Sequence, residues 1–243
     1  VLFNTIEKHE EVISEKSITF FKQLNKKQFQ LPPYFIKGSY YENSGKYCSI
    51  IGFEHNRYAF KAASMPISNR TMDVFNFTLK FSKSLNKEIF DFISIRPYPT
   101  ESGWNTKNRY EDFFGSPKIS SNESLNLFIK NAKIIVCSYP QTAFSEAMAS
   151  NKPTILIYDP EYNEYHPEAE ELIDKLRSAK IIFNDPFKAA SHVNLNWNNI
   201  DEWWLSDEVV SARNYFYKIA LKVNSNWLIE WKAFLDKEIN THK

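Results

Sequence analysis

The sequence has few glycines, five among 243 residues. Glycine-rich loops cradle phosphates in kinases, P-loop enzymes and common dehydrogenases, because glycine lets the backbone approach the ligand closely. The sequence contains no Gly-x-Gly-x-x-Gly, no Walker motif and no Gly-x-Ser-x-Gly elbow. These enzyme classes are therefore disfavoured.

Cysteine is nearly absent as well, since only Cys48 and Cys137 occur. Each lies inside an apolar run typical of a buried strand, which predicts two reduced thiols and a reducing, cytoplasmic setting. The histidines form no spacing with Cys, Asp or Glu that suggests a metal site. We therefore expect no metal and no cofactor.

The sequence also lacks long apolar runs and an excess of charge. No stretch approaches the ~20 apolar residues of a membrane span, and Val1 to Phe20 lacks the apolar core of a signal peptide. Thirty basic and twenty-nine acidic side chains leave a formal charge of +1. This balance gives no argument for a nucleic-acid partner or an anionic membrane.

What the sequence does contain is a series of short apolar runs from Cys48 onward, alternating with amphipathic windows. Continuous apolarity over four to six residues is typical of parallel strands covered by helices on both faces. We predict an α/β fold, a Rossmann-like parallel sheet covered by helices. Its strands are expected at Cys48–Phe53, Phe90–Ile95, Ile134–Cys137, Thr154–Tyr158 and Ile181–Phe183.

Two amphipathic windows between these strands should pack on the sheet. In the first, the predicted inward face carries Val74, Phe77, Phe81 and Leu85, and Ser68 stands at the expected N-cap. In the second, the predicted inward face carries Ala143, Phe144, Ala147 and Met148, before Pro153 at a strand start.

The chain divides into three predicted parts. Residues 1–46 are expected to form a linker or peripheral helical arm, with helical stretches at Glu7–Lys16 and Phe20–Lys27. Residues 47–197 form the Rossmann-like lobe, and residues 198–243 form helices that pack on it. The helical segments after Asn184 are predicted at Pro186–Val193, Ile200–Leu205, Asp207–Lys222 and Trp227–Lys237.

The segment Ile134–Tyr158 reads as strand, turn, helix, loop and strand. A helix that opens at the carboxyl end of a parallel strand directs free N–H groups toward the ligand crevice, where phosphate binds well. Ser138 and Gln141 also have the spacing of a capping box, which explains them without a ligand. Thr142 and Glu146 point away from the packing face, so they are free for a ligand or for solvent.

Two further segments leave predicted strands on the same rim. Arg96, followed by Pro97, Tyr98 and Pro99, could grip a phosphate bidentately or form a salt bridge across the loop. Asp159 and Glu161 could bind sugar hydroxyls or serve as turn formers, for which Asp-Pro is common.

From Tyr58 to Leu235 the sequence resembles a family of transferases encoded with O-antigen and other surface-carbohydrate genes. The matching stretches are Met65–Ser68, Arg96–Pro99 with Gly103-Trp104, Ser138–Pro153, Asp159–Tyr162, Asn184–Pro186, Asp201–Trp204 and Trp227–Leu235. The family resembles the two-lobe GT-B glycosyltransferases that make capsular and teichoic polymers. This resemblance implies that Arg96, Tyr98, Ser138, Thr142 and Glu146 contact a nucleotide-activated sugar donor.

The resemblance implies metal-independent sugar transfer in bacterial surface-polysaccharide synthesis, with a carbohydrate or lipid-linked acceptor. The first forty-odd residues cannot supply an acceptor-binding lobe, so we expect that lobe outside this chain. A cytoplasmic location is expected, and attachment at the inner membrane face stays open. The alternatives are a CDP-glycerol-type phosphotransferase, a sugar-nucleotide 2-epimerase, and a non-catalytic binding or assembly lobe.

Overall fold

The computed structural model describes residues 15–33, 44–58, 70–161, 165, 167–224 and 226–241. Its centre is a five-stranded sheet in which every neighbouring pair is parallel. The strands are β3 (Tyr47–Ile51), β4 (Ile93–Arg96), β5 (Ala132–Cys137), β6 (Thr154–Ile157) and β7 (Ile182–Phe183), in the order β4-β3-β5-β6-β7. The predicted α/β fold and all five strands are confirmed.

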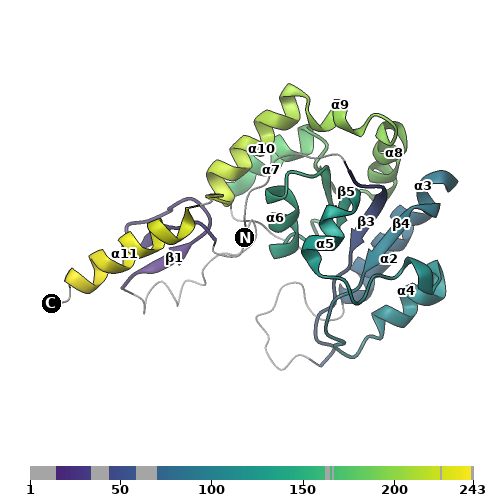
Figure 1. Ribbon diagram of the computed structural model, residues 1–243, viewed down its shortest axis with the longest axis horizontal. Helices are drawn as coiled ribbons and strands as arrows, with labels where there is room; N and C mark the ends of the chain where they lie inside the picture. Colours follow the sequence, from purple (N-terminus) through teal and green to yellow (C-terminus); the bar gives the residue numbers. More distant parts are fainter. Residues whose placement is uncertain are drawn as a thin grey trace.

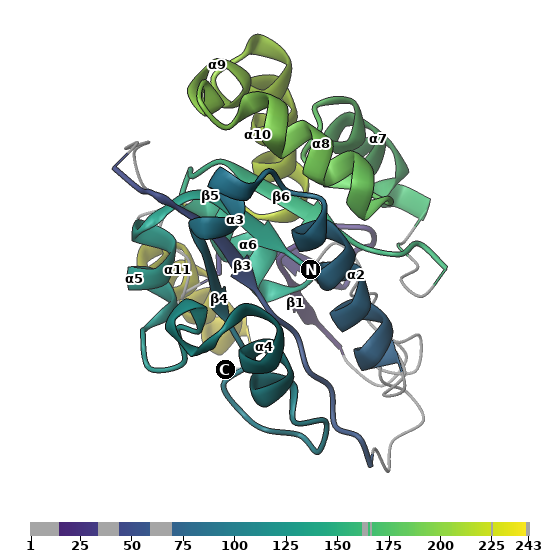
Figure 2. The same ribbon diagram turned by 90° about the vertical axis from the view of Figure 1, so that its right-hand side faces the viewer.

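Helices cover both faces of this sheet (Figure 1, Figure 2). They are α2 (Thr71–Lys83), α3 (Lys87–Asp91), α4 (Thr106–Phe114), α5 (Leu125–Lys130), α6 (Thr142–Ala149), α7 (Glu170–Ser178), α8 (Pro186–Asn196), α9 (Ile200–Trp204) and α10 (Asp207–Ala220). The last helix, α11 (Trp227–Thr241), does not cover this sheet (Figure 1). Two short 3-10 turns, η2 (Ser116–Lys118) and η3 (Pro167–Ala169), join them.

Alternate strand residues enter two separate cores, one on each face of the sheet. Ile134 and Val136 pack into the core beneath α2, α4 and α8, whereas Ile135 and Cys137 pack into the core beneath α5, α6, α7 and α10. Because both faces are buried, the strands need apolar residues at every position. This burial explains the continuous apolar runs of the sequence.

The packing face of α2 is partly as predicted. Phe81 and Leu85 are buried, whereas Val74 and Phe77 are only partly buried, and Phe75 and Thr78 are buried in addition. Thr78 can be buried because its hydroxyl donates to the Val74 carbonyl at 3.1 Å, which satisfies the polar group within the helix. The face predicted for α6 is confirmed, with Phe144, Ala147 and Met148 buried.

The strand predicted from Phe90 begins later, at Ile93. The amides of Ile89 and Phe90 both donate to the Asn86 carbonyl, and this turn starts the short helix α3. Ser68, the predicted N-cap of the first window, lies outside the described residues.

The cysteines lie on opposite faces of the sheet, as free and fully buried thiols. Burial raises the pKa of Cys48 to about 12 and also raises the pKa of Cys137. The predicted pair of buried, reduced thiols is confirmed.

The amino-terminal segment is not helical where it is described. A two-stranded parallel sheet forms from β1 (Ser17–Thr19) and β2 (Gln28–Gln30), and the helix predicted at Phe20–Lys27 is absent. Asn25 explains the difference, because its side-chain oxygen accepts hydrogen bonds from the amides of Lys27 and Gln28 and holds a turn.

The four predicted carboxyl-terminal helices are present as α8 to α11. Helices α9 and α10 pack on the lobe, where Trp204 and Phe216 are fully buried. Helix α11 differs from our expectation, because it lies against β1 and β2 and projects away from the five-stranded sheet (Figure 1). We call the unit of β1, β2 and α11 the terminal module.

Candidate functional site

A cavity of about 290 Å³ opens at the carboxyl ends of β3, β4 and β5. The chain passes from β3 to β4 on one side and then returns to β5 on the other side of β3. Open α/β sheets bind ligands at such a reversal of strand order, where the connections leave in opposite directions. Strand register fixes the position, because Ile51 pairs with both Arg96 and Cys137.

Five of the eight predicted site residues line this cavity. They are Arg96, Tyr98, Gln141, Thr142 and Glu146. Arg96 ends β4, and Thr142 begins α6, whose first N–H groups lack helical partners. The sequence separates Arg96 from Glu146 by fifty residues, and the sheet topology brings them to one place.

Arg96 is the cationic group of the cavity. Its Nε donates to the Glu123 carbonyl at 3.4 Å, which orients the guanidinium along one edge. In the described part of the chain, Arg96 forms no ion pair with a carboxylate. The alternative role of Arg96, a salt bridge across its loop, is therefore not observed. The two outer nitrogens of its guanidinium group can bind an anion.

Glu146 provides the opposite charge from the first turns of α6. Partial burial raises the pKa of its carboxyl group, and the positive charge of Arg96 works in the opposite direction. The same carboxylate raises the pKa of Cys137, a second effect after burial, and both residues line the cavity. A ligand hydroxyl would relieve the desolvation of Glu146 by donating a hydrogen bond.

Aromatic rings form one wall of the cavity. The rings of Phe53 and Tyr139 stack with centroids 4.0 Å apart, and Tyr98 meets Phe53 edge-on at 6.3 Å. Gln141 donates through Nε2 to the Tyr139 hydroxyl at 3.0 Å and fixes that ring. Tyr98 is 45% exposed, so part of its side chain remains open to a ligand in the cavity.

Ser138 does not form the predicted capping box. The N-cap of α6 is Gln141, and its side chain makes no capping hydrogen bond. The Ser138 hydroxyl instead donates to the Ile51 carbonyl at 3.0 Å, and Ser138 is buried. Ser138 thus links the ends of β3 and β5 beneath the cavity, and it does not line it.

Asp159 and Glu161 lie outside this cavity, in the loop after β6. The Glu161 amide donates to the Asp159 carboxylate at 3.0 Å, an arrangement typical of an Asx turn. The turn-forming role of Asp159 is therefore the one observed. Tyr162 and the stretch Met65–Ser68, which contributed to the family resemblance, lie outside the described residues.

A buried acid, Glu54, supports the loop after β4 and was missed by sequence reasoning. Its carboxylate accepts hydrogen bonds from the Ser102 amide at 2.6 Å and from the Thr106 hydroxyl. Glu54 is only 3% exposed. A lone acid directly after a predicted strand carries no distinguishing pattern, so only its position on the rim could have suggested a role.

A second cavity, of about 410 Å³, lies beside the edge strand β7 and is lined by Arg177, Lys180, Lys188 and His192 among others. It is larger, but it contains none of the predicted site residues and lies away from the reversal of strand order. The smaller cavity is therefore the candidate functional site, and we call it the rim pocket.

Comparison with known families finds a match to the LIC12162 family of transferases over residues 1–235. The chain belongs to this transferase family. No curated protein and no solved structure matches it. The LIC12162 family match confirms the predicted transferase identity.

Over the described residues, no helix combines the length and apolarity that crossing a membrane requires. Within the same residues, the His, Cys, Asp and Glu side chains nowhere gather in threes as a metal ion would require.

Proposed function

We propose that the chain is the donor-binding lobe of a glycosyltransferase that takes its sugar from a nucleotide donor. The observation that supports this most strongly is the position of the rim pocket at the reversal of strand order, with Arg96 and the α6 amino terminus facing the same space. Both features favour a phosphate group: one by charge, the other by free N–H groups and the helix dipole.

In this proposal the pocket holds the nucleotide, and the sugar lies outside. A volume of about 290 Å³ is near the lower limit of ligand pockets, so a complete sugar nucleotide would extend beyond it. Tyr98 would stack on the base, and Glu146 would accept hydrogen bonds from ribose hydroxyls. The acceptor, a carbohydrate or lipid-linked molecule, would bind on a lobe outside this chain.

The chemical contribution of these residues is electrostatic. When the bond between sugar and phosphate breaks, negative charge grows on the departing nucleotide. Arg96 and the N–H groups of α6 would stabilise that charge without a metal ion. A general base for the acceptor hydroxyl would come from the other lobe. This activity belongs to surface-polysaccharide synthesis in the cytoplasm, at the inner face of the membrane.

A thermal-shift screen with UDP-, GDP-, CMP- and CDP-linked donors tests the proposal. At one hundred times its dissociation constant a ligand adds ~2.7 kcal/mol to the free energy of unfolding. For a chain of this length that is a rise in Tm of roughly 5–11 °C. We expect one class of sugar nucleotide to produce it. A response confined to CDP-glycerol would favour phosphotransfer instead, and no response to any donor would contradict nucleotide binding.

Glu146→Gln separates binding from folding. Because burial raises the pKa of Glu146, the folded protein holds its proton more tightly, and stability falls as pH rises through the ordinary carboxyl range. The neutral amide should therefore cost no stability at neutral pH. We expect an unchanged or higher Tm for the free variant, together with a smaller donor-induced shift.

A further inference from the structure

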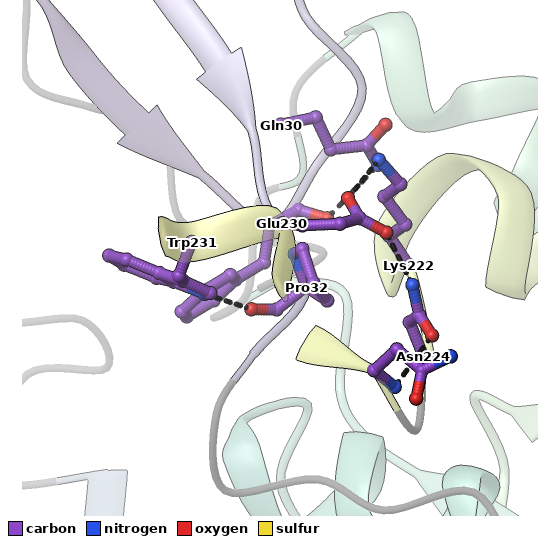
Figure 3. A network of polar contacts seen from close by, with 8 residues as sticks. Gln30, Pro32, Lys222, Asn224, Glu230 and Trp231 are labelled. Atoms are coloured by element: carbon purple, nitrogen blue, oxygen red, sulfur yellow. Dashed lines mark hydrogen bonds and ion pairs between the residues drawn. The ribbon is translucent and has the colours of Figure 1, made fainter. Parts of the chain in front are cut away.

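Among the described residues, helix α11 is held by contacts with the β1–β2 segment and with the chain that precedes it (Figure 3). The Trp231 indole Nε1 donates to the Pro32 carbonyl at 2.7 Å, and the Phe234 ring lies 5.1 Å from the Phe29 ring. Glu230 also forms an ion pair with Lys222, and the distance from Lys222 Nζ to Glu230 Oε2 is 2.7 Å. These contacts fix which side of α11 points outward.

The outward face of α11 is strongly apolar. Four aliphatic side chains on it are exposed: Leu228 by 63%, Ile229 by 68%, Leu235 by 47% and Ile239 by 57%. A surface helix normally carries one apolar stripe, and α11 already uses one against β1 and β2. Exposed apolar side chains gathered on a second side of a surface helix are typical of an interaction surface.

The charges within this face are Lys232 and Asp236, and both are exposed. At 3.6 residues per turn, Leu228, Lys232, Leu235 and Ile239 follow one line along the helix, with Asp236 beside it. In the described residues, neither Lys232 nor Asp236 forms an ion pair. The apolar stripe therefore carries one unpaired charge of each sign.

We propose that α11 pairs antiparallel with α11 of a second copy of this chain, forming a homodimer. An antiparallel pair centred near Phe234 brings Lys232 opposite Asp236 of the second copy, twice by symmetry, and Ile229 opposite Ile239. A parallel pair would place Lys232 against Lys232 and Asp236 against Asp236. The charge pattern makes this face complementary to itself in a second copy, and it favours the antiparallel direction over the parallel one.

The interface is small. One helix pair buries less than the ~1,600 Å² of a standard protein interface, so we expect a dissociation constant in the micromolar range. The surface lies on the terminal module, apart from the rim pocket, so this inference is independent of the proposed transferase chemistry.

Sedimentation velocity from ~1 to ~200 µM tests the dimer in the range where micromolar affinity is visible. The wild-type chain should pass from monomer to dimer. Lys232→Glu or Asp236→Lys alone should raise the dissociation constant at least tenfold, because each creates like-charge contacts. The matched control is Lys130→Glu on α5, an equal charge change at an exposed site, and it should leave dimerisation unchanged.

Mixing the two variants is the decisive step. Lys232→Glu in one copy and Asp236→Lys in the other restore opposite charges at both contacts, so the mixture should form a heterodimer close to wild type in affinity. Association of the mixed variants would also show that both are folded. The proposal would be overturned if the wild-type chain stayed monomeric at every concentration. It would also be overturned if neither charge-reversal variant weakened the dimer, or if the mixture of the two variants failed to associate.

Discussion

Glu54 should be the acid on which the loop after β4 most depends. Glu54→Ala removes the acceptor of two good hydrogen bonds, from the Ser102 amide at 2.6 Å and from the buried Thr106 hydroxyl. A buried donor without a partner costs ~1–3 kcal/mol, so the two together predict a loss of roughly 3 kcal/mol. For this chain length that corresponds to a fall in Tm of about 6–12 °C.

Glu101→Ala provides the matched control in the same loop. Glu101 also accepts from loop amides, those of Gly103 and Asn105, but it is exposed to solvent, so water can replace its hydrogen bonds. Differential scanning calorimetry of both variants separates the two cases. A Tm for Glu54→Ala within about 2 °C of wild type would refute the reasoning, since it would mean that the loop does not need its buried carboxylate.

Three further predictions concern the cores. Trp204→Ala, at a fully buried ring, should cost ~3–5 kcal/mol in urea denaturation, while Leu205→Ala, at a side chain 51% exposed, should cost little. Cys48 and Cys137 should resist thiol reagents until denaturant is added, and rapid native labelling would contradict their burial. Burial and Lys180 lower the pKa of His192 to about 4. Stability should therefore fall as pH drops from 6.5 toward 4, and His192→Gln should flatten that fall in a Tm-versus-pH series.

The central sheet could be predicted from sequence because burial on both faces leaves a local pattern. β5 and β6 are apolar at nearly every position, and this pattern requires no knowledge of distant contacts. The carboxyl-terminal helices were found for a similar reason. Asp207 and Glu208 follow Ser206, and acidic residues in a first turn suit the helix dipole.

The terminal module could not be predicted, since its stability comes from distant parts of the chain. β1 and β2 are three residues each, too short for a periodic signal. The Trp231 indole N–H donates to the carbonyl of Pro32, which is 199 residues away in the sequence. Nothing in the local sequence of α11 distinguishes such a contact from packing on the main lobe.

The candidate site was partly predictable. Arg96 at the end of β4 and Thr142 at the start of the helix after β5 reach one pocket, because parallel strands share a carboxyl edge. Ser138 fits a local capping pattern equally well, and only the neighbouring Ile51 carbonyl decides its role. Tyr139 and Phe53 were missed, since an aromatic residue after a strand is as common in a core as at a ligand.

Calorimetric titration of the Arg96→Ala variant tests the donor-site proposal most directly. The donor is the sugar nucleotide that gives the largest thermal shift, and Arg109→Ala, at an exposed arginine of α4 outside the rim pocket, is the matched control. Loss of a charge-assisted phosphate contact should weaken binding by ~1.5–3 kcal/mol, about ten- to a hundredfold, with Arg109→Ala near wild type. Equal donor affinity in wild type and Arg96→Ala would show that the rim pocket does not hold the nucleotide phosphates.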